Sequence, residues 1–408
     1  MTEQVEAKCP FNHQGEALAY PFGDPGRLHL SPSYAAARTG EGLARVQPPF
    51  GGQAWLATRY EDVKTVMADP RFSRAASIAE NTPRLVPFMP PPDTIMALDP
   101  PHHTRLRRVL NQAFTMRRVE VLRPRIQEIT DELLDAIAKG PGKADLVHSF
   151  ALPVSLIVIT ELLGVPYEDR EKFGAWVGAI FSMETPPEVV QQSNIDLMTY
   201  LAGLIAQRRE QPAEDLLSIL VQARDENDRL TEQEMIGLGA AVLMAGYEVT
   251  SHHLGSLTYA LLADPAKLAE LQADLGLVPQ AIEEMLRFVP PAVGEGMTRI
   301  ATEDVELGGV LVKAGDAVLP STMAANRDAE VFEDAEVMDF HRAKNPHLSF
   351  GHGPHHCVGA NLARLELQIA ITSLLKRFPA LRLDGTVDDV PWDTASVWSG
   401  PRELPVLF

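Results

Sequence analysis

The chain has 408 residues, enough for a large hydrophobic core, and its 45% hydrophobic and 22% charged residues exclude a disordered, collagen-like or coiled-coil protein. Its 55 acidic residues outnumber the 36 basic ones, and the formal net charge of −19 disfavours non-specific binding to nucleic acid. Two cysteines, Cys9 and Cys357, cannot form a disulfide framework. The N-terminus lacks a basic segment followed by an apolar run, and we expect a cytoplasmic protein without a nucleic-acid partner.

The first quarter of the chain shows little periodicity. Residues 1–45 are rich in Pro, Gly and small polar residues, which predicts an irregular N-terminal arm. Residues 46–408 contain no repeat or linker and are expected to form one domain. Gln53–Thr58 is predicted to be a strand, and Tyr60–Ala68 a helix. The proline-rich stretch Ser73–Pro101 that follows is expected to be irregular, with apolar side chains that suit a pocket wall.

The middle of the chain has helical patterns over residues 103–164 and 167–210. Thr231 and Glu234 form a capping-box signature, which predicts the start of a helix that continues to Asp264. Such a helix is about 50 Å long. Its first half is apolar nearly all round, which predicts a buried central helix. This apolar run is still shorter than the roughly 20 residues of a membrane span, and we expect no membrane association.

The last third combines helices with small β structure. A short helix is predicted at Gln280–Phe288 after Pro279, and small strands between glycine turns at 299–320. A glycine-rich loop then leads through Cys357 into a periodic helix at Ala360–Arg377. The predicted fold is therefore mainly α, a single helical body with small β-sheets.

Cys357 lies between the glycine-rich loop and the start of a helix. Free amide N–H groups and a helix N-terminus both stabilise an anionic sulfur, which favours a thiolate. A lone cysteine is more commonly a small buried hydrophobic residue. Zinc is disfavoured, because His352, His355 and His356 are too close in sequence to converge with Cys357 on one tetrahedral ion.

The segment Phe350–Gly359 matches the cysteine-loop pattern of the cytochrome P450 family, F-x-x-G-x-(H or R)-x-C-x-G, at every defined position. The resemblance covers roughly residues 50–408, and its Asp99–Arg107 signature is similar to the soluble bacterial branch of the family. Three further family signatures occur in the expected order: Asp99–Arg107, Ala245-Gly246-Tyr247-Glu248 and the pair Glu284 and Arg287.

This resemblance implies a cytochrome P450 fold with haem b between the central helix and the cysteine loop. The thiolate of Cys357 is the implied iron ligand, an axial donor that favours O–O cleavage. The two haem propionates need cationic or hydrogen-bonding partners. By motif position, these partners are His103, Arg107, Arg299 and His355.

The resemblance also implies a buried ion pair between Glu284 and Arg287, which lie at i, i+3 on one helix. Its role would be structural rather than catalytic. Arg342 and Asn345 lie just before the cysteine loop and are expected to complete the network.

Glu248 is an acid in an otherwise apolar helix, and the resemblance implies a role in proton delivery. The family usually places a threonine directly after this acid, but here the position is Val249 and the threonine is Thr250. One residue turns a helix by about 100°, which prevents a simple replacement. Three interpretations follow: the substrate hydroxyl orders the water chain, Thr250 acts through a distorted helix, or oxidation proceeds with little oxygen insertion. His252 and His253 are interpreted as core or surface histidines.

The expected substrate pocket suits a medium to large organic molecule. The resemblance to macrolide-tailoring relatives favours a secondary metabolite. The residues expected to line the pocket are Phe88, Val242, Ala245, Val249, Val293 and Trp398.

One basic cluster contrasts with the acidic background. The resemblance implies that a small acidic ferredoxin docks there and, with a ferredoxin reductase, supplies electrons, since the chain contains no fused reductase. We expect a monomer. The cluster comprises Arg105, Arg107, Arg108, Arg117, Arg118, Arg123 and Arg125.

The leading hypothesis is a haem-thiolate monooxygenase that uses O2. One alternative is an oxidase that couples C–C or C–N bonds without oxygen insertion, motivated by Val249. A non-catalytic haem sensor is a further alternative, against which Glu248 argues.

Overall fold

The computed structural model describes residues 16–23, 27–40, 42–85, 89, 91–225, 230–290, 297–393 and 398–408. Cys9 and two of the residues expected to line the pocket, Phe88 and Val293, lie outside the described residues. The chain divides into two compact units, each built from separate stretches of sequence. Unit 1 comprises Met1–Pro91, Val293–Val337 and Pro346–His356, and unit 2 comprises Pro92–Ala292, Met338–Asn345 and Cys357–Phe408.

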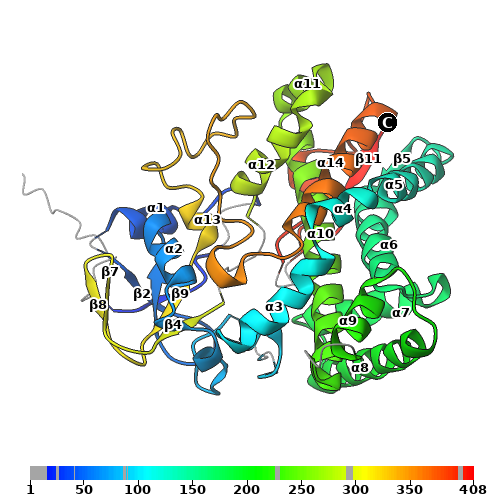
Figure 1. Ribbon diagram of the computed structural model, residues 1–408. Helices are drawn as coiled ribbons and strands as arrows, with labels where there is room; N and C mark the ends of the chain where they lie inside the picture. Colours follow the sequence, from blue (N-terminus) through cyan, green and yellow to red (C-terminus); the bar gives the residue numbers. More distant parts are fainter. Residues whose placement is uncertain are drawn as a thin grey trace, which may run out of the picture. The chain divides into compact units, whose positions relative to one another are not determined.

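Unit 1 is organised around a six-stranded mixed sheet (Figure 1). The β1–β2 and β3–β9 pairs are parallel and the other pairs are antiparallel. The strand order is β1 (Leu18–Ala19), β2 (Ala44–Gln47), β3 (Ala54–Ala57), β9 (Ala317–Pro320), β6 (Arg299–Ala301) and β4 (Phe72–Ser73). A separate hairpin joins β7 (Val305–Leu307) to β8 (Val310–Val312), and the helices are α1 (Pro32–Thr39), α2 (Tyr60–Ala68), α13 (Thr322–Ala325) and the 3-10 turns η1 (Ala75–Ile78) and η6 (Gly353–His355).

The prediction of an irregular arm over residues 1–45 is wrong for its described part. β1 pairs with β2, and α1 begins at Pro32 after Ser31, whose side chain accepts a hydrogen bond from the Ser33 amide. Tyr20 and Tyr34 are buried in a core cluster beneath this segment. A two-residue strand and an eight-residue helix are too short to produce a periodic signal, which explains the error. Residue 45 is therefore no domain boundary.

Unit 2 is mainly helical and carries a small antiparallel sheet in the order β10 (Arg382–Leu383), β11 (Pro405–Leu407), β5 (Lys143–Asp145). Short turns are η2 (Ile95–Ala97), η4 (Tyr167–Asp169), η5 (Leu275–Leu277) and η7 (Val387–Asp389), and η3 (Val147–Ala151) is a π-helical turn. The helices are α3 (His102–Ala113), α4 (Met116–Val121), α5 (Arg123–Ala138), α6 (Leu152–Leu163), α7 (Arg170–Phe181), α8 (Pro187–Glu210), α9 (Leu216–Asp225), α10 (Glu232–Ala263), α11 (Pro265–Ala273), α12 (Val278–Phe288) and α14 (Ala360–Arg377).

The long helix α10 runs through unit 2 and contacts α6, α8 and α14 (Figure 1). Its capping box is complete: the Glu234 amide donates to Thr231 Oγ1 at 3.1 Å, and the Thr231 amide donates to Glu234 Oε2 at 2.8 Å. Most of its side chains are buried, as predicted. None of the described helices combines the length and apolar character that crossing a bilayer requires.

Candidate functional site

The cysteine loop ends unit 1 and holds its shape through glycine. Gly351 and Gly353 have positive φ angles of 75° and 70°, which side chains other than glycine rarely adopt. A Cβ on Gly353 would lie 2.6 Å from the Met67 oxygen and 2.8 Å from Ala68 Cα. The loop therefore approaches the end of α2 more closely than any larger residue would permit.

Cys357 begins the last segment of unit 2, directly before α14. Its side chain is exposed. Surrounding protein atoms raise the pKa of the thiol, whereas the Gly359 amide and the guanidinium groups of Arg107 and Arg364 lower it, with a net rise. An accessible sulfur beside an amide donor and two cations suits a soft metal ion, because coordination replaces the proton that the thiol otherwise keeps.

Two of the predicted propionate partners, His103 and Arg107, lie one turn apart on α3. His103 is buried, and its amide donates to the Asp99 oxygen at 2.9 Å. Arg107 Nε donates to Asn111 Oδ1 at 3.0 Å. Burial lowers the pKa of Arg107, and the nearby Cys357 opposes this. A partly desolvated guanidinium of this kind favours an anionic ligand, and the pair therefore fits a carboxylate group of haem.

The other two predicted partners belong to unit 1. Arg299 is the buried first residue of β6, and its Nη1 donates to the Met297 oxygen at 2.8 Å. His355 is partly buried at the end of η6. Arginine and histidine are residue types that bind carboxylates, so this pair is also chemically suited to an anionic group.

The middle of α10 has an accessible stripe, which we define as Ala245 and Val249. Ala245 is exposed and Val249 partly exposed, one helical turn apart, on a helix that is otherwise mostly buried. Gly246, between them, packs directly on Ile159 of α6, where a Cβ would overlap the Ile159 side chain. The stripe is therefore accessible, while Gly246 packs against α6 on another side of the same helix. A helix that borders a cofactor needs both an accessible side and a fixed position.

The structure places two of the predicted site residues of α10 in buried positions. Thr250 is buried, about 100° around the helix from Val249, and α10 is continuously α-helical there. Thr250 therefore does not lie on the accessible stripe, and its catalytic role stays a prediction. Val242, expected in the pocket, packs in the hydrophobic core. Trp398, also expected in the pocket, is partly buried, with its ring centroid 6.0 Å from that of Phe181.

Glu248 faces a cavity of about 280 Å³ inside unit 2, which is lined in part by Tyr247, Ser251, His252 and Asp393. Glu248 is 7% exposed. His252 Nδ1 lies 3.5 Å from Glu248 Oε2, and His252 Nε2 lies 3.8 Å from Asp393 Oδ2. Burial raises the pKa of Glu248; His252 lowers it and Asp393 raises it further. The acid can therefore hold a proton nearer neutral pH than an exposed glutamate.

Two of the residues near Glu248, His252 and Asp393, are not predicted as site residues from the sequence. His252 was interpreted as a core or surface histidine, although its i, i+4 spacing from Glu248 was a readable signal of proximity. Asp393 is 141 residues from His252 along the chain (393 − 252), and no local pattern connects them. Arg364, which adjoins Cys357 electrostatically, was also missed.

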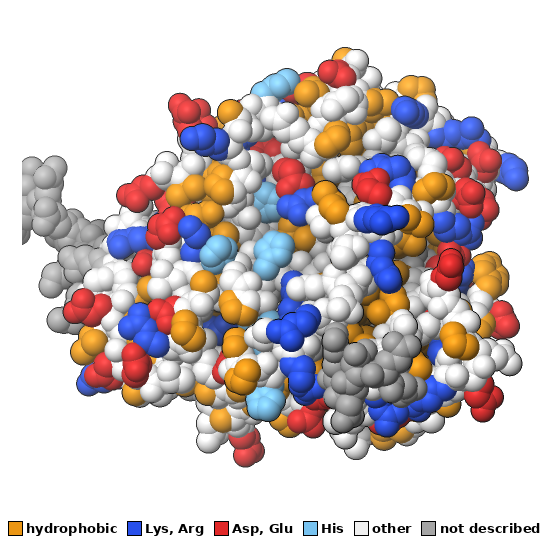
Figure 2. All heavy atoms as spheres, viewed as in Figure 1, with side chains coloured by type: hydrophobic (Ala, Val, Ile, Leu, Met, Phe, Trp, Pro, Cys, Tyr) orange, Lys and Arg blue, Asp and Glu red, His pale blue; other side chains and the backbone are white. Residues whose placement is uncertain are grey.

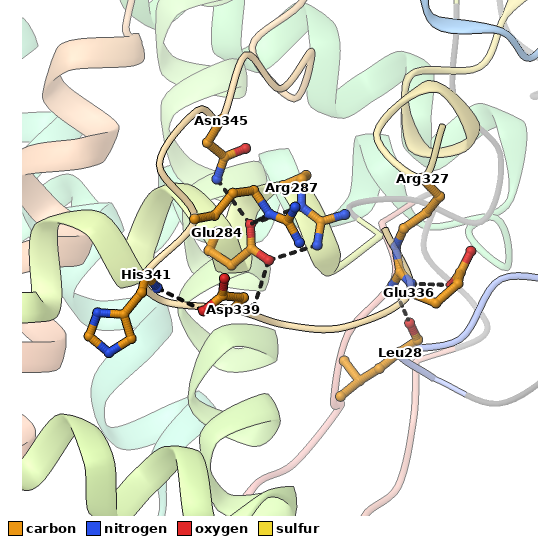
Figure 3. A network of polar contacts seen from close by, with 9 residues as sticks. Leu28, Glu284, Arg287, Arg327, Glu336, Asp339, His341 and Asn345 are labelled. Atoms are coloured by element: carbon orange, nitrogen blue, oxygen red, sulfur yellow. Dashed lines mark hydrogen bonds and ion pairs between the residues drawn. The ribbon is translucent and has the colours of Figure 1, made fainter. Parts of the chain in front are cut away.

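Glu284 and Arg287 form the predicted buried pair on α12 (Figure 3). Arg287 donates from Nε to Glu284 Oε2 at 2.8 Å and from Nη2 to Oε1 at 2.7 Å. Arg342 Nε and Asn345 Nδ2 each donate to Oε2 at 3.0 Å, which confirms the predicted network. The Asp339 amide adds a further bond to Oε1 at 2.8 Å. Glu284 therefore connects α12 to residues 338–345.

The arginine cluster is less basic than its sequence indicates, because acids from distant helices neutralise part of it. Arg105 pairs with Glu234 of α10, and Arg125 with Glu161 of α6. Figure 2 shows acidic side chains interspersed among the basic ones over α3, α4 and α5. Three exposed arginines form no ion pair with another described residue, and we call them the basic face: Arg108, Arg117 and Arg118.

Comparisons with known proteins agree with this geometry. The family model described as cytochrome P450 matches residues 51–401. Nocardicin C N-oxygenase of Nocardia uniformis subsp. tsuyamanensis is 49% identical over 96% of this chain and 99% of its own length. Mycinamicin IV hydroxylase/epoxidase of Micromonospora griseorubida is 45% identical over 96% and 99%. The crystal structure of cytochrome P450mel 107F1 with biaryl coupling reactivity superposes with a TM-score of 0.92 at 40% identity, covering 96% of this chain and all of that one.

Proposed function

Because this chain belongs to the cytochrome P450 family, a family of haem monooxygenases, we propose that Cys357 is its iron ligand. The observation that carries the proposal is the accessible Cys357 sulfur beside the Gly359 amide and two arginines. Haem, when bound through a thiolate, supplies the activation of O2. We further propose that His103 and Arg107 in unit 2, with Arg299 and His355 in unit 1, bind the two propionates.

The test of the iron ligand is spectroscopic. Cys357→Ala should abolish the red-shifted Soret band of the reduced, CO-bound protein, because that band depends on a thiolate ligand. Cys9→Ala removes the only other cysteine and is the matched control, which should keep the band. An unchanged band in Cys357→Ala would overturn the assignment.

We propose that the reaction inserts one oxygen atom of O2 into a medium to large organic secondary metabolite. Relatives of this chain include a nocardicin C N-oxygenase and a mycinamicin IV hydroxylase/epoxidase. Glu248 supports this outcome, since a buried acid beside a cavity can hold a proton for oxygen cleavage. Turnover under labelled O2 tests the outcome: label in the product supports insertion.

A second outcome, oxidative coupling without oxygen insertion, is favoured by one observation. The accessible stripe of α10 carries Val249, which has no hydroxyl to assist proton delivery, and the buried Thr250 does not replace it. One structural relative has biaryl coupling reactivity. Full turnover with no label in the product would exclude insertion, and a product with a new C–C or C–N bond would establish coupling.

We also propose that an acidic ferredoxin, reduced by its own reductase, docks on the basic face. Arg108, Arg117 and Arg118 are exposed, and Met116 and Val121 beside them are 64% and 73% exposed. Exposed cations and exposed apolar side chains on the same segment suit a transient complex with an acidic partner, whose encounter rate the cations raise.

A further inference from the structure

We propose that His252 and Asp393 form a proton-supply path that carries protons from the cavity beside α10 to Glu248. The inference rests on the proposed function, because it assumes that Glu248 delivers a proton for oxidation. It assigns a role to two residues that the family signatures do not include, and it concerns only side chains within unit 2.

Oxygen atoms lie near both ring nitrogens of His252. Nδ1 lies 2.9 Å from the main-chain oxygen of Glu248 and 3.5 Å from its carboxylate Oε2. Nε2 lies 3.8 Å from Asp393 Oδ2. A ring between two acceptors is suited to carry a proton on both nitrogens, which only the charged imidazolium does. Its Nδ1 proton then lies near both the main-chain oxygen and the carboxylate of Glu248.

The cavity provides water at the other end of the path. It is lined by the buried Glu248 and Ser251, and also by His148 and Arg402, which are exposed. A cavity of about 280 Å³ that includes both buried and exposed residues offers room for a chain of waters with polar partners. The other titratable groups that line it are Tyr247, His148 and Arg402.

The charges around His252 support the same role. Burial opposes the charged imidazolium, but the Asp393 and Glu248 carboxylates more than offset this, and the pKa of His252 is raised. In the transfer, the N–H bond at Nδ1 breaks and an O–H bond forms on ionised Glu248. The now neutral His252 regains a proton at its free ring position from cavity water, which draws on bulk solvent. No electrons move.

A purely structural role explains less of this arrangement. His253, the next residue, makes the same bond to a main-chain oxygen four residues earlier, with Nδ1 2.9 Å from the Val249 oxygen. It does not line the cavity. The bond to a main-chain oxygen therefore forms at both histidines, and the two carboxylates near His252 are an additional feature of that position.

The first experiment measures the charge of His252 without turnover. In the reduced, CO-bound holoenzyme, which is diamagnetic, the ring C–H resonance of His252 is followed by NMR against pH. The midpoint should exceed the ordinary histidine value of about 6.5 and fall in Asp393→Asn and in Glu248→Gln. His148→Gln, at the exposed end of the same cavity, should leave it unchanged. A wild-type midpoint at or below the ordinary value would overturn the inference.

The second experiment measures turnover with the same variants. His252→Gln should lower kcat at least about tenfold with KM unchanged and increase the solvent deuterium isotope effect, because general acid assistance is lost. Asp393→Asn, a milder change, should move the alkaline limb of the pH profile to lower pH. Wild-type kcat and pH profile in both variants would overturn the path but leave the monooxygenase proposal intact. Absence of oxygenation in the wild-type protein would instead overturn the proposed function, while the NMR midpoints would remain valid.

Discussion

Glu284→Gln is the substitution whose effect the structure defines most sharply. The Glu284 and Arg287 side chains are 1% and 0% exposed, and Arg342, at 8%, shares the same carboxylate. Glutamine has nearly the same shape but no charge, so both guanidinium groups would lose their common counter-ion. Breaking a buried pair in this way costs about 3–5 kcal/mol of unfolding free energy.

This cost converts into a measurable change in melting temperature. An unfolding entropy of about 2.1 cal/mol/K per residue, over 408 residues, gives about 0.9 kcal/mol/K, and the expected decrease in Tm is about 4–6 °C. The assay is calorimetric or circular-dichroism melting of the haem-loaded protein at neutral pH.

The neighbouring residue Glu283 provides a matched control on the same helix. It pairs with Arg364 at 2.7 Å, but both side chains are 28–30% exposed. A partly exposed pair contributes about 0–1 kcal/mol, and Glu283→Gln should therefore lower Tm by about 1 °C at most. Equal decreases for the two variants would refute the reasoning that burial of Glu284 sets the cost.

Three further predictions follow from the site. Arg107→Ala should speed haem loss to a haem-acceptor protein by about tenfold or more, because a charge-assisted bond is lost, whereas Arg105→Ala, which removes a guanidinium already paired with Glu234, should change it little. Charge reversal of Arg117 and Arg118 to Glu should lower the rate of ferredoxin association about tenfold at low salt and much less at high salt, by stopped-flow measurement. His252→Gln should lower Tm more at pH 6 than at pH 9: a raised histidine pKa contributes stability that is full below about 6.5 and lost as pH rises through the folded value.

The sequence predicts the long elements of the fold well, because a periodic pattern repeated over many residues is not obscured by individual exceptions. α14 has its predicted bounds, Ala360–Arg377, and α10 begins at its predicted capping box. The strand β1 and the helix α1 are not predicted, since elements of two and eight residues are too short to show a periodic pattern. They are stabilised by pairing with distant segments, which no local pattern reports.

Parts of the candidate site can likewise be predicted from the sequence, and other parts cannot. Cys357 and the Glu284–Arg287 pair are readable because their motifs are local in sequence. The neutralisation of the arginine cluster by Glu234 and Glu161 is not, because those acids belong to other helices. Asp393 lies far along the chain from His252, and only the fold brings the two together. Local chemistry is therefore predictable from this sequence, whereas charge balance is not.

The interleaving of the two units restricts how this enzyme can be recombined with its relatives. The chain passes from one unit to the other after Pro91, Ala292, Val337, Asn345 and His356. A chimaera made with a single crossover therefore has at least one unit whose segments come from two different parent proteins. Residues 338–345, only a short insertion along the chain, supply the donors that surround the Glu284 carboxylate. A parent that contributes α12 should therefore also contribute this segment, or the chimaera inherits a buried charge without its matched partners.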